Sequence, residues 1–172
     1  MATTAESSSS GSAPERRADQ LDERELRAWR GMLRVHATLT KALDAELEAA
    51  HGLPLSSYEV LMHLYDAEGQ RMRMSDLASS VILSRSGLTR LVDRLERDGL
   101  IERQSCASDA RGSFASLTEE GRQKLSAARE THLAGVRSLF VDHFTLAELE
   151  AMGAVWERLL PGAINAPGPA CG

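Results

Sequence analysis

The sequence has no run of about 18 apolar residues, the length that a membrane-spanning helix needs. Residues 1–12 also lack a basic start followed by an apolar stretch, so we expect no secretory signal. The two cysteines, Cys106 and Cys171, show no CxxC spacing and form no disulfide framework. These absences predict a soluble protein of the reducing cytoplasm, without a membrane partner.

Signatures of common catalytic and metal sites are also missing. The chain contains no GxSxG, HExxH, P-loop or GxGxxG pattern. Its five histidines include no HxxxH pair, and no His/Cys cluster occurs. His132 and His143 are eleven residues apart and could share a helix face, but this spacing matches no established ligand pattern. We therefore expect no enzyme activity, no cofactor and no metal site.

The chain does contain enough apolar residues for one core, 42% of 172 residues, which fits a single domain. Its net charge is −5, but the charge is unevenly distributed. Residues 71–115 hold eight arginines against six acidic residues, a local charge of +2, and the remainder of the chain carries −7. A mildly basic middle in an acidic frame is typical of a compact DNA-reading module on a body that stays away from the phosphates.

Composition and apolar spacing divide the chain into a domain and two tails. Residues 1–19, rich in Ser, Ala and Thr, are expected to be a disordered tail, and residues 162–172, with Pro, Gly and Ala, a flexible one. The single domain over 20–161 should contain, in order, a helix over 22–50, a helix opened by Ser56 or Ser57 and ended by Gly69, a short helix capped by Ser75, a helix capped by Ser84 and ended by Gly99, strands over 100–104 and 113–117, a helix from Thr118 to about His143, and a helix over 145–160.

Two short helices joined by a tight turn and followed by a hairpin form a winged helix-turn-helix. We expect this module over 56–117, in a mainly α fold with a small β-hairpin wing. The helices over 22–50 and 118–160 carry apolar stripes outside the module, and few residues remain to cover them. We therefore interpret these N- and C-terminal helices as a dimerisation region that pairs with a second copy of the chain.

The helix from Ser84 to Asp98 is the predicted recognition helix. If its four apolar residues point inward, the opposite face presents hydroxyl groups and arginines to double-stranded DNA. Arginine can donate two hydrogen bonds to guanine or to a phosphate. The expected DNA-binding residues are Arg73, Ser75, Ser84, Arg85, Ser86, Thr89, Arg90, Arg94 and Arg111. The alternative is an ordinary solvated face on which Arg97 pairs with Asp93.

The wing is expected over residues 106–112, a short polar loop. Arg111 near its tip could enter a narrow minor groove, where the negative potential is enhanced. Asp109 could hold Arg111 in position through a charge-assisted hydrogen bond. A plain hairpin turn, with Asp109 and Gly112 present for turn chemistry, is the competing interpretation.

These two segments together resemble a known family. LSRSGLTRLVDRLERDGLIER (83–103) and SDARGSFASLTEEGRQKL (108–125) are similar to the recognition helix, wing and following helix of MarR-type regulators. Asp109 and Arg111 match the aspartate-x-arginine of the wing. The resemblance implies a homodimer built by the terminal helices, a palindromic operator and, in many members, release by a small ligand or an oxidant. Ala110 departs from the family, because a second basic residue often stands there.

A repressor released by a small-molecule effector is the function that this resemblance favours. An effector could bind between the first two helices and the fifth, in an apolar pocket lined by Trp29, Met32, His36, Tyr58, Met62 and Tyr65. Plain core and dimer packing is the alternative role for these residues. Two other regulators remain open: one without a ligand, and a thiol sensor using Cys106, whose basic neighbour is Arg103, three residues away.

Overall fold

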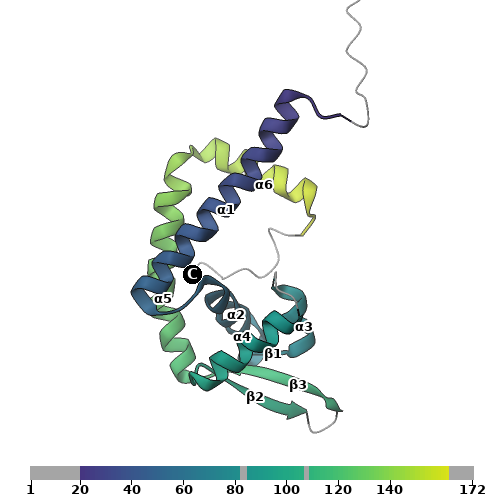
Figure 1. Cartoon of the computed structure of the whole chain (residues 1–172), viewed down its shortest axis with the longest axis vertical. Helices are drawn as coiled ribbons and strands as arrows, with labels where there is room; N and C mark the ends of the chain where they lie inside the picture. The colour runs from purple at the N-terminus through teal and green to yellow at the C-terminus, as the bar shows by residue number, and fades with distance from the viewer. Residues whose placement is uncertain (1–19, 82–84, 107–108, 163–172) are drawn as a thin grey trace, which may run out of the picture. The chain divides into compact units, whose positions relative to one another are not determined.

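The computed structural model describes residues 20–81, 85–106 and 109–162, so Ser84 and both predicted tails, apart from Gly162, lie outside the described residues. Helices dominate, and three strands form one small sheet (Figure 1). In chain order the elements are α1 (Glu23–His51), α2 (Leu55–Asp66), η1 (Glu68–Gln70), β1 (Arg71–Arg73), α3 (Met74–Ser80), α4 (Arg85–Arg97), β2 (Ile101–Cys106), β3 (Asp109–Leu117), α5 (Glu119–Leu139), η2 (Val141–His143) and α6 (Leu146–Leu159). This order confirms the predicted mainly α fold with a winged helix-turn-helix.

The chain divides into two compact units within α1, one ending at Ala37 and the other beginning at Thr38. In the first unit, the start of α1 is closed by reciprocal hydrogen bonds. The amide of Asp22 donates to the Glu25 carboxylate, and the amide of Glu25 donates to that of Asp22, both at 2.8 Å. This pairing satisfies two amides that have no partner within the helix.

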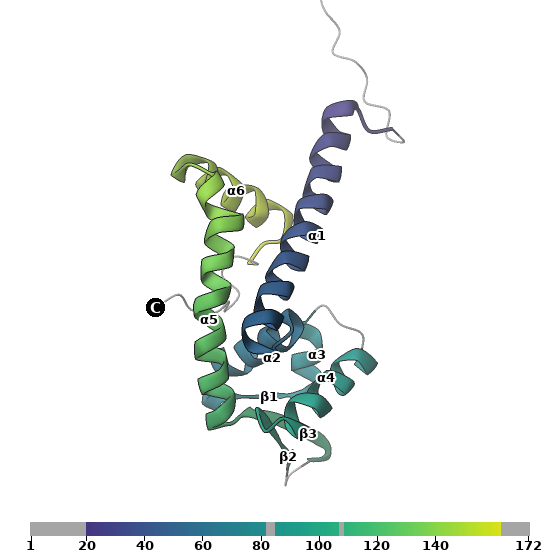
Figure 2. The same ribbon diagram turned by 60° about the vertical axis from the view of Figure 1, so that its left-hand side comes forward.

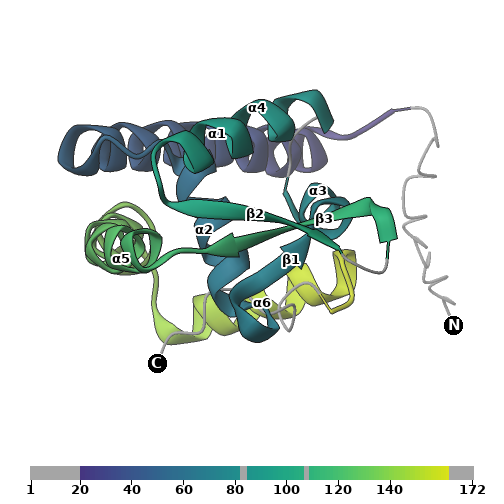
Figure 3. The same ribbon diagram turned by 90° about the horizontal axis from the view of Figure 1, so that it is seen from below.

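The core of the second unit is built around α2. Val60, Leu61 and Leu64 are completely buried, and the helix contacts α3, α5 and the sheet. Figure 3 shows α2 crossing one face of the sheet. Leu47 from α1 and Leu125 from α5 join the same core. No helix in the part of the chain that the structure describes is both long and apolar enough to cross a membrane.

The sheet has three antiparallel strands in the order β1-β3-β2. Its two long strands extend beyond the predicted limits and reach Cys106 and Asp109, because ladder pairing continues into the segment expected to be a loop. Strand β1 was not predicted from the sequence. Its three residues are too few for an alternating pattern to be recognised, and they become a strand only by pairing with residues 114–116.

Two predicted helix starts are wrong. Pro54, rather than Ser56 or Ser57, occupies the N-cap of α2, and the Asp44 carboxylate accepts the Leu55 amide at 2.8 Å. Proline suits a helix start because its φ is fixed and it has no amide hydrogen to leave unpaired. Ser75 lies inside α3, whose N-cap is Arg73.

Other predicted boundaries are confirmed. Thr118 caps α5, since its hydroxyl accepts the Gly121 amide at 3.0 Å. Gly99 ends α4 with a φ of 72°, a left-handed conformation that favours glycine. The Leu100 amide then donates back to the Leu95 carbonyl at 2.9 Å, and the Gly99 amide to the Glu96 carbonyl at 3.0 Å. These two bonds form a Schellman motif, which turns the chain directly from α4 into β2.

The end of α4, the first residues of β2, the last of β3 and the start of α5 meet at Leu100. The Thr118 amide donates to the Leu100 carbonyl at 3.2 Å, and the Thr118 hydroxyl donates to the Gly99 carbonyl at 2.7 Å. Gly121 lies against the same carbonyl, where a Cβ would approach the oxygen to 2.0 Å. Helix α5 leaves the sheet from this point (Figure 2). We name Gly99, Leu100, Thr118 and Gly121 the junction.

Replacing Gly121 with alanine should disrupt the junction. The new Cβ would overlap the Leu100 backbone and touch Leu117, so the start of α5 must shift. We expect Gly121→Ala to reduce the free energy of unfolding by about 2–3 kcal/mol. Gly31→Ala in α1 is the control, because no atom lies within 4 Å of its added Cβ. Urea denaturation followed by circular dichroism measures both variants, and equal stability for the two would contradict the packing described.

Candidate nucleic-acid interface

Helix α4 has the two faces that its sequence predicts. Its apolar residues point into the core and are at most 7% exposed: Leu88, Leu91, Val92 and Leu95. Ser86, Thr89 and Arg90 lie exposed along the opposite side. The helix runs beside β2 at one edge of the sheet (Figure 3). A hydroxyl-rich, basic face on a helix anchored by a leucine stripe is therefore free to enter a groove of DNA.

Arg90 and Arg97 are the two exposed cations of this face that remain available. Within the described residues, neither side chain makes a hydrogen bond or an ion pair. Arg97 therefore does not pair with Asp93 in the structure, in contrast to the alternative considered from the sequence. An unpaired guanidinium keeps all its donors for a base edge or a phosphate.

The side chains of Arg94 and Asp93 contact neighbouring elements of the protein. The Arg94 guanidinium donates to the hydroxyl of Ser57 on α2 at 2.9 Å, and Ser57 is 1% exposed. Asp93 pairs with Arg103 on β2. Neither contact could be predicted from the sequence, because each joins residues of different elements. The one sequence signal for an internal partner of Arg103 was its place in the strand pattern, at a position that faces inward.

The wing is a two-stranded ribbon that projects past β1 (Figure 1). Asp109 and Arg111 belong to the first residues of β3 rather than to a loop. Their side chains, and that of Arg85, lie outside the described residues, so their predicted roles stay predictions. The backbone nevertheless extends the ribbon beyond the body of the sheet on the side where a minor-groove contact is expected.

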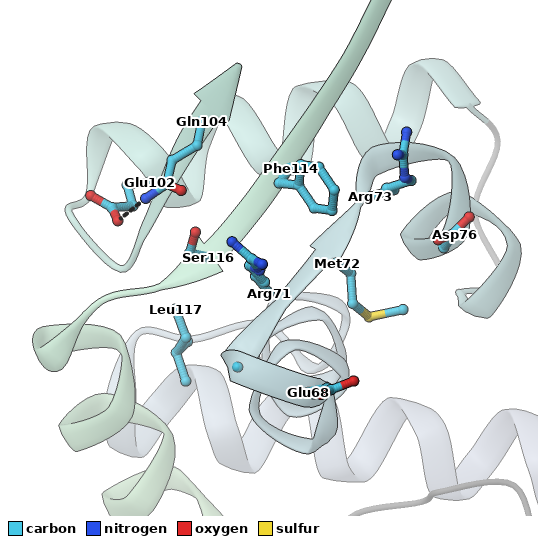
Figure 4. A pocket seen from close by; sticks show the side chains of 11 residues that line it. Glu68, Arg71, Met72, Arg73, Asp76, Glu102, Gln104, Phe114, Ser116 and Leu117 are labelled. Atoms are coloured by element: carbon cyan, nitrogen blue, oxygen red, sulfur yellow. Dashed lines mark hydrogen bonds between the residues drawn. The ribbon is translucent and has the colours of Figure 1, made fainter. Parts of the chain in front are cut away.

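Arg73 and Ser75 lie on the segment that leads into α3. Both are exposed, and the Ser75 hydroxyl donates to Asp76 at 3.1 Å. The guanidinium of Arg73 lies 5.0 Å from the centre of the Phe114 ring, and that of Arg71 lies 5.6 Å from it. Figure 4 shows this cation–π arrangement on the outer face of the sheet, where it lines a hollow of about 830 Å³.

The six residues of the predicted effector pocket fall into different environments. Tyr58 and Met62 are buried, whereas Tyr65 is exposed, and none of the six lines the hollow in Figure 4. The ring of His132 on α5 lies 4.6 Å from that of Tyr58. Burial lowers the pKa of His132, and the nearby Glu46 carboxylate opposes that shift. No group of three potential metal ligands occurs among the residues that the structure describes.

Comparisons with known proteins agree with this geometry. A sequence profile of the MarR family matches residues 51–112. The fold is similar to that of AbsC, a MarR family transcriptional regulator from Streptomyces coelicolor, with 37% identity and a TM-score of 0.76 over 81% of this chain and 94% of that one. Sco3205 of the same organism and family, solved in complex with DNA, is 33% identical, with a TM-score of 0.75 over 87% of this chain and 97% of that one. Among curated proteins, the transcriptional repressor YetL of Bacillus subtilis is 29% identical over 64% of this chain and 68% of its own length.

Proposed function

The chain belongs to the MarR family of transcriptional regulators, and on that basis we propose that it is a cytoplasmic repressor that binds a palindromic operator as a homodimer. The observation that carries this proposal is the exposed face of α4, where Arg90 and Arg97 have no partner among the described residues. A similar chain, Sco3205, was solved in complex with DNA, which supports the same use of the fold here. The repressor named YetL supports repression rather than activation.

A palindromic operator follows from one recognition helix per chain. A two-fold dimer presents two copies of α4, so its half-sites are inverted and their centres lie about one helical turn, ~10 bp, apart. The chain as a whole carries a charge of −5. The net positive charge of residues 71–115 favours phosphate contacts at α4 and the sheet, while the net negative charge of the remainder is repelled by the DNA.

Exposed apolar side chains support the homodimer. On α6 and directly after it, Leu146 is 80% exposed, Leu159 65% and Leu160 68%. In the first unit, Trp29 and Leu33 are also about half exposed. Apolar residues gathered along a helix are energetically unfavourable in water, and a second copy of the same surface is the partner that a symmetric regulator provides.

Arg90 and Arg111 should have separable roles in DNA binding. Loss of a base contact by Arg90→Ala should cost about 1–3 kcal/mol for operator and much less for scrambled duplex. Loss of a groove contact by Arg111→Ala should weaken both duplexes similarly and flatten the dependence of log K on log salt by about one unit. Titrations of both duplexes across a salt series measure the two effects. If Arg90→Ala left discrimination intact while Arg111→Ala abolished it, α4 would not be the main reader.

Charged substitutions on the apolar surfaces should separate the dimer. We expect Leu33→Asp and Leu159→Asp to shift the protein towards monomer, because each places a carboxylate where an apolar contact is needed. Both should also weaken operator binding, since one half-site alone is then engaged. Ser126→Asp, at an exposed position of α5, is the control. Sedimentation equilibrium over a concentration series gives the dissociation constants, and a wild-type monomer that binds operator fully would exclude the homodimer.

We further propose that a small apolar ligand releases the protein from DNA. The packing of Tyr58 on α2 against His132 on α5 supports a site near these helices, since it joins the winged helix-turn-helix module to the long helix that follows it. A bound effector should raise the melting temperature by mass action and lower operator affinity. Thermal melts and operator titrations with a panel of small apolar aromatic compounds, repeated with Tyr58→Ala, test this. A panel in which no compound changes either quantity would favour the regulator without a ligand.

A further inference from the structure

Arg103 connects the recognition helix to the wing through three contacts. Its guanidinium pairs with the Asp93 carboxylate and lies 3.6 Å from that of Glu96, and its backbone amide donates to Glu96 at 3.2 Å. Asp93 and Glu96 are one turn apart on α4, so a single strand residue holds one full turn of the helix. All three side chains are partly shielded, between 30% and 44% exposed, which limits screening by water.

The position of Arg103 in the sheet makes this contact mechanically important. Arg103 pairs with Ala115, which in turn pairs with Met72 of β1. One residue further, at Gln104, the third strand ends, and only β2 and β3 continue into the wing. At about 3.4 Å per residue, the ribbon extends roughly 10 Å from Arg103 to its end at Cys106. A rotation of the ribbon by about 15° at Arg103 would therefore move its end by roughly 3 Å, which is about the length of a hydrogen bond.

The same contact controls the charges on α4. Asp93 lies three residues after Arg90 and four residues before Arg97, both spacings at which helical side chains can pair. If Arg103 did not bind Asp93, the carboxylate would be available to either arginine. Pairing with Arg103 therefore leaves Arg90 and Arg97 without an acidic partner among the described residues.

We propose that Arg103 is a positioning residue for DNA recognition. It fixes the angle between α4 and the wing, so that both enter neighbouring grooves together, and it withholds Asp93 from the arginines that face the DNA. This role rests on the proposed DNA binding, but its mechanical part concerns the free protein and is measurable without DNA.

Hydrogen exchange of the free protein tests the mechanical part. In Arg103→Gln, amides of 104–106 and 109–114 should exchange faster than in the wild type, while those of α5 stay unchanged. Arg103→Lys keeps the charge but loses the planar guanidinium, so it should have a smaller effect on the exchange of the same amides. It is the variant to measure if Arg103→Gln does not fold. Arg122→Gln is the control, because it removes an arginine whose side chain binds Glu119 and Gln70 and no residue of α4 or β2. Wing exchange equal to wild type in both Arg103 variants would overturn the proposal.

Operator binding tests the second part. We expect Arg103→Gln to bind operator about tenfold more weakly and Arg122→Gln to stay within about twofold of wild type. Adding Asp93→Asn to Arg103→Gln should recover part of the loss, because the freed carboxylate no longer competes for Arg90. No recovery, or a loss of affinity without faster wing exchange, would mean that Arg103 contacts DNA itself and would overturn the proposal. If the wild type bound no duplex while wing exchange still rose only in the Arg103 variants, the proposed function would fail and the mechanical part would stand.

Discussion

The DNA-reading part of this chain depends on the close contact at the junction, where the Leu100 carbonyl lies against Gly121. The Schellman motif at Gly99 turns α4 into β2, and the Thr118 hydroxyl accepts the Gly121 amide while donating to Gly99. Four chain segments are thereby fixed by backbone hydrogen bonds and by the short side chain of Thr118. The orientation of α4 and the wing relative to α5 is consequently set by main-chain geometry, and a side chain at Gly121 has no space in it.

The arginines of α4 and β2 differ in whether they have a partner within the protein. Arg94 was predicted from the sequence to contact DNA, and in the structure its guanidinium donates to Ser57. Arg103, for which no DNA contact was predicted, pairs with Asp93. Arg90 and Arg97 then remain as the exposed cations of α4 without partners among the described residues. Of the four arginines on α4 and β2 whose side chains the structure describes, two therefore make internal contacts and two face solvent. This division explains how a protein of net charge −5 can still offer a basic surface to DNA.

The sequence predicted what depends on short-range periodicity and failed where distant residues decide. Leucine spacing located the buried face of α4, and Thr118 and Gly99 marked real helix ends, because capping is a local interaction. Ser57 had the composition of a cap, yet Pro54 begins the helix and Arg94 occupies the hydroxyl. Strand β1 exists only through its pairing with β3, and the Asp93–Arg103 contact crosses from a helix to a strand. Neither could be derived from neighbouring residues alone.

The exposed leucines of α6 also bear on how such a regulator would respond to its own abundance. If the operator-binding form consists of two copies, then at concentrations below the dimer dissociation constant the amount of dimer rises with the square of chain concentration. A halving of synthesis would then remove about three quarters of the active species, by simple mass action. The hydrophobicity of one helix would thereby set a threshold for gene dosage, independently of any contact with DNA.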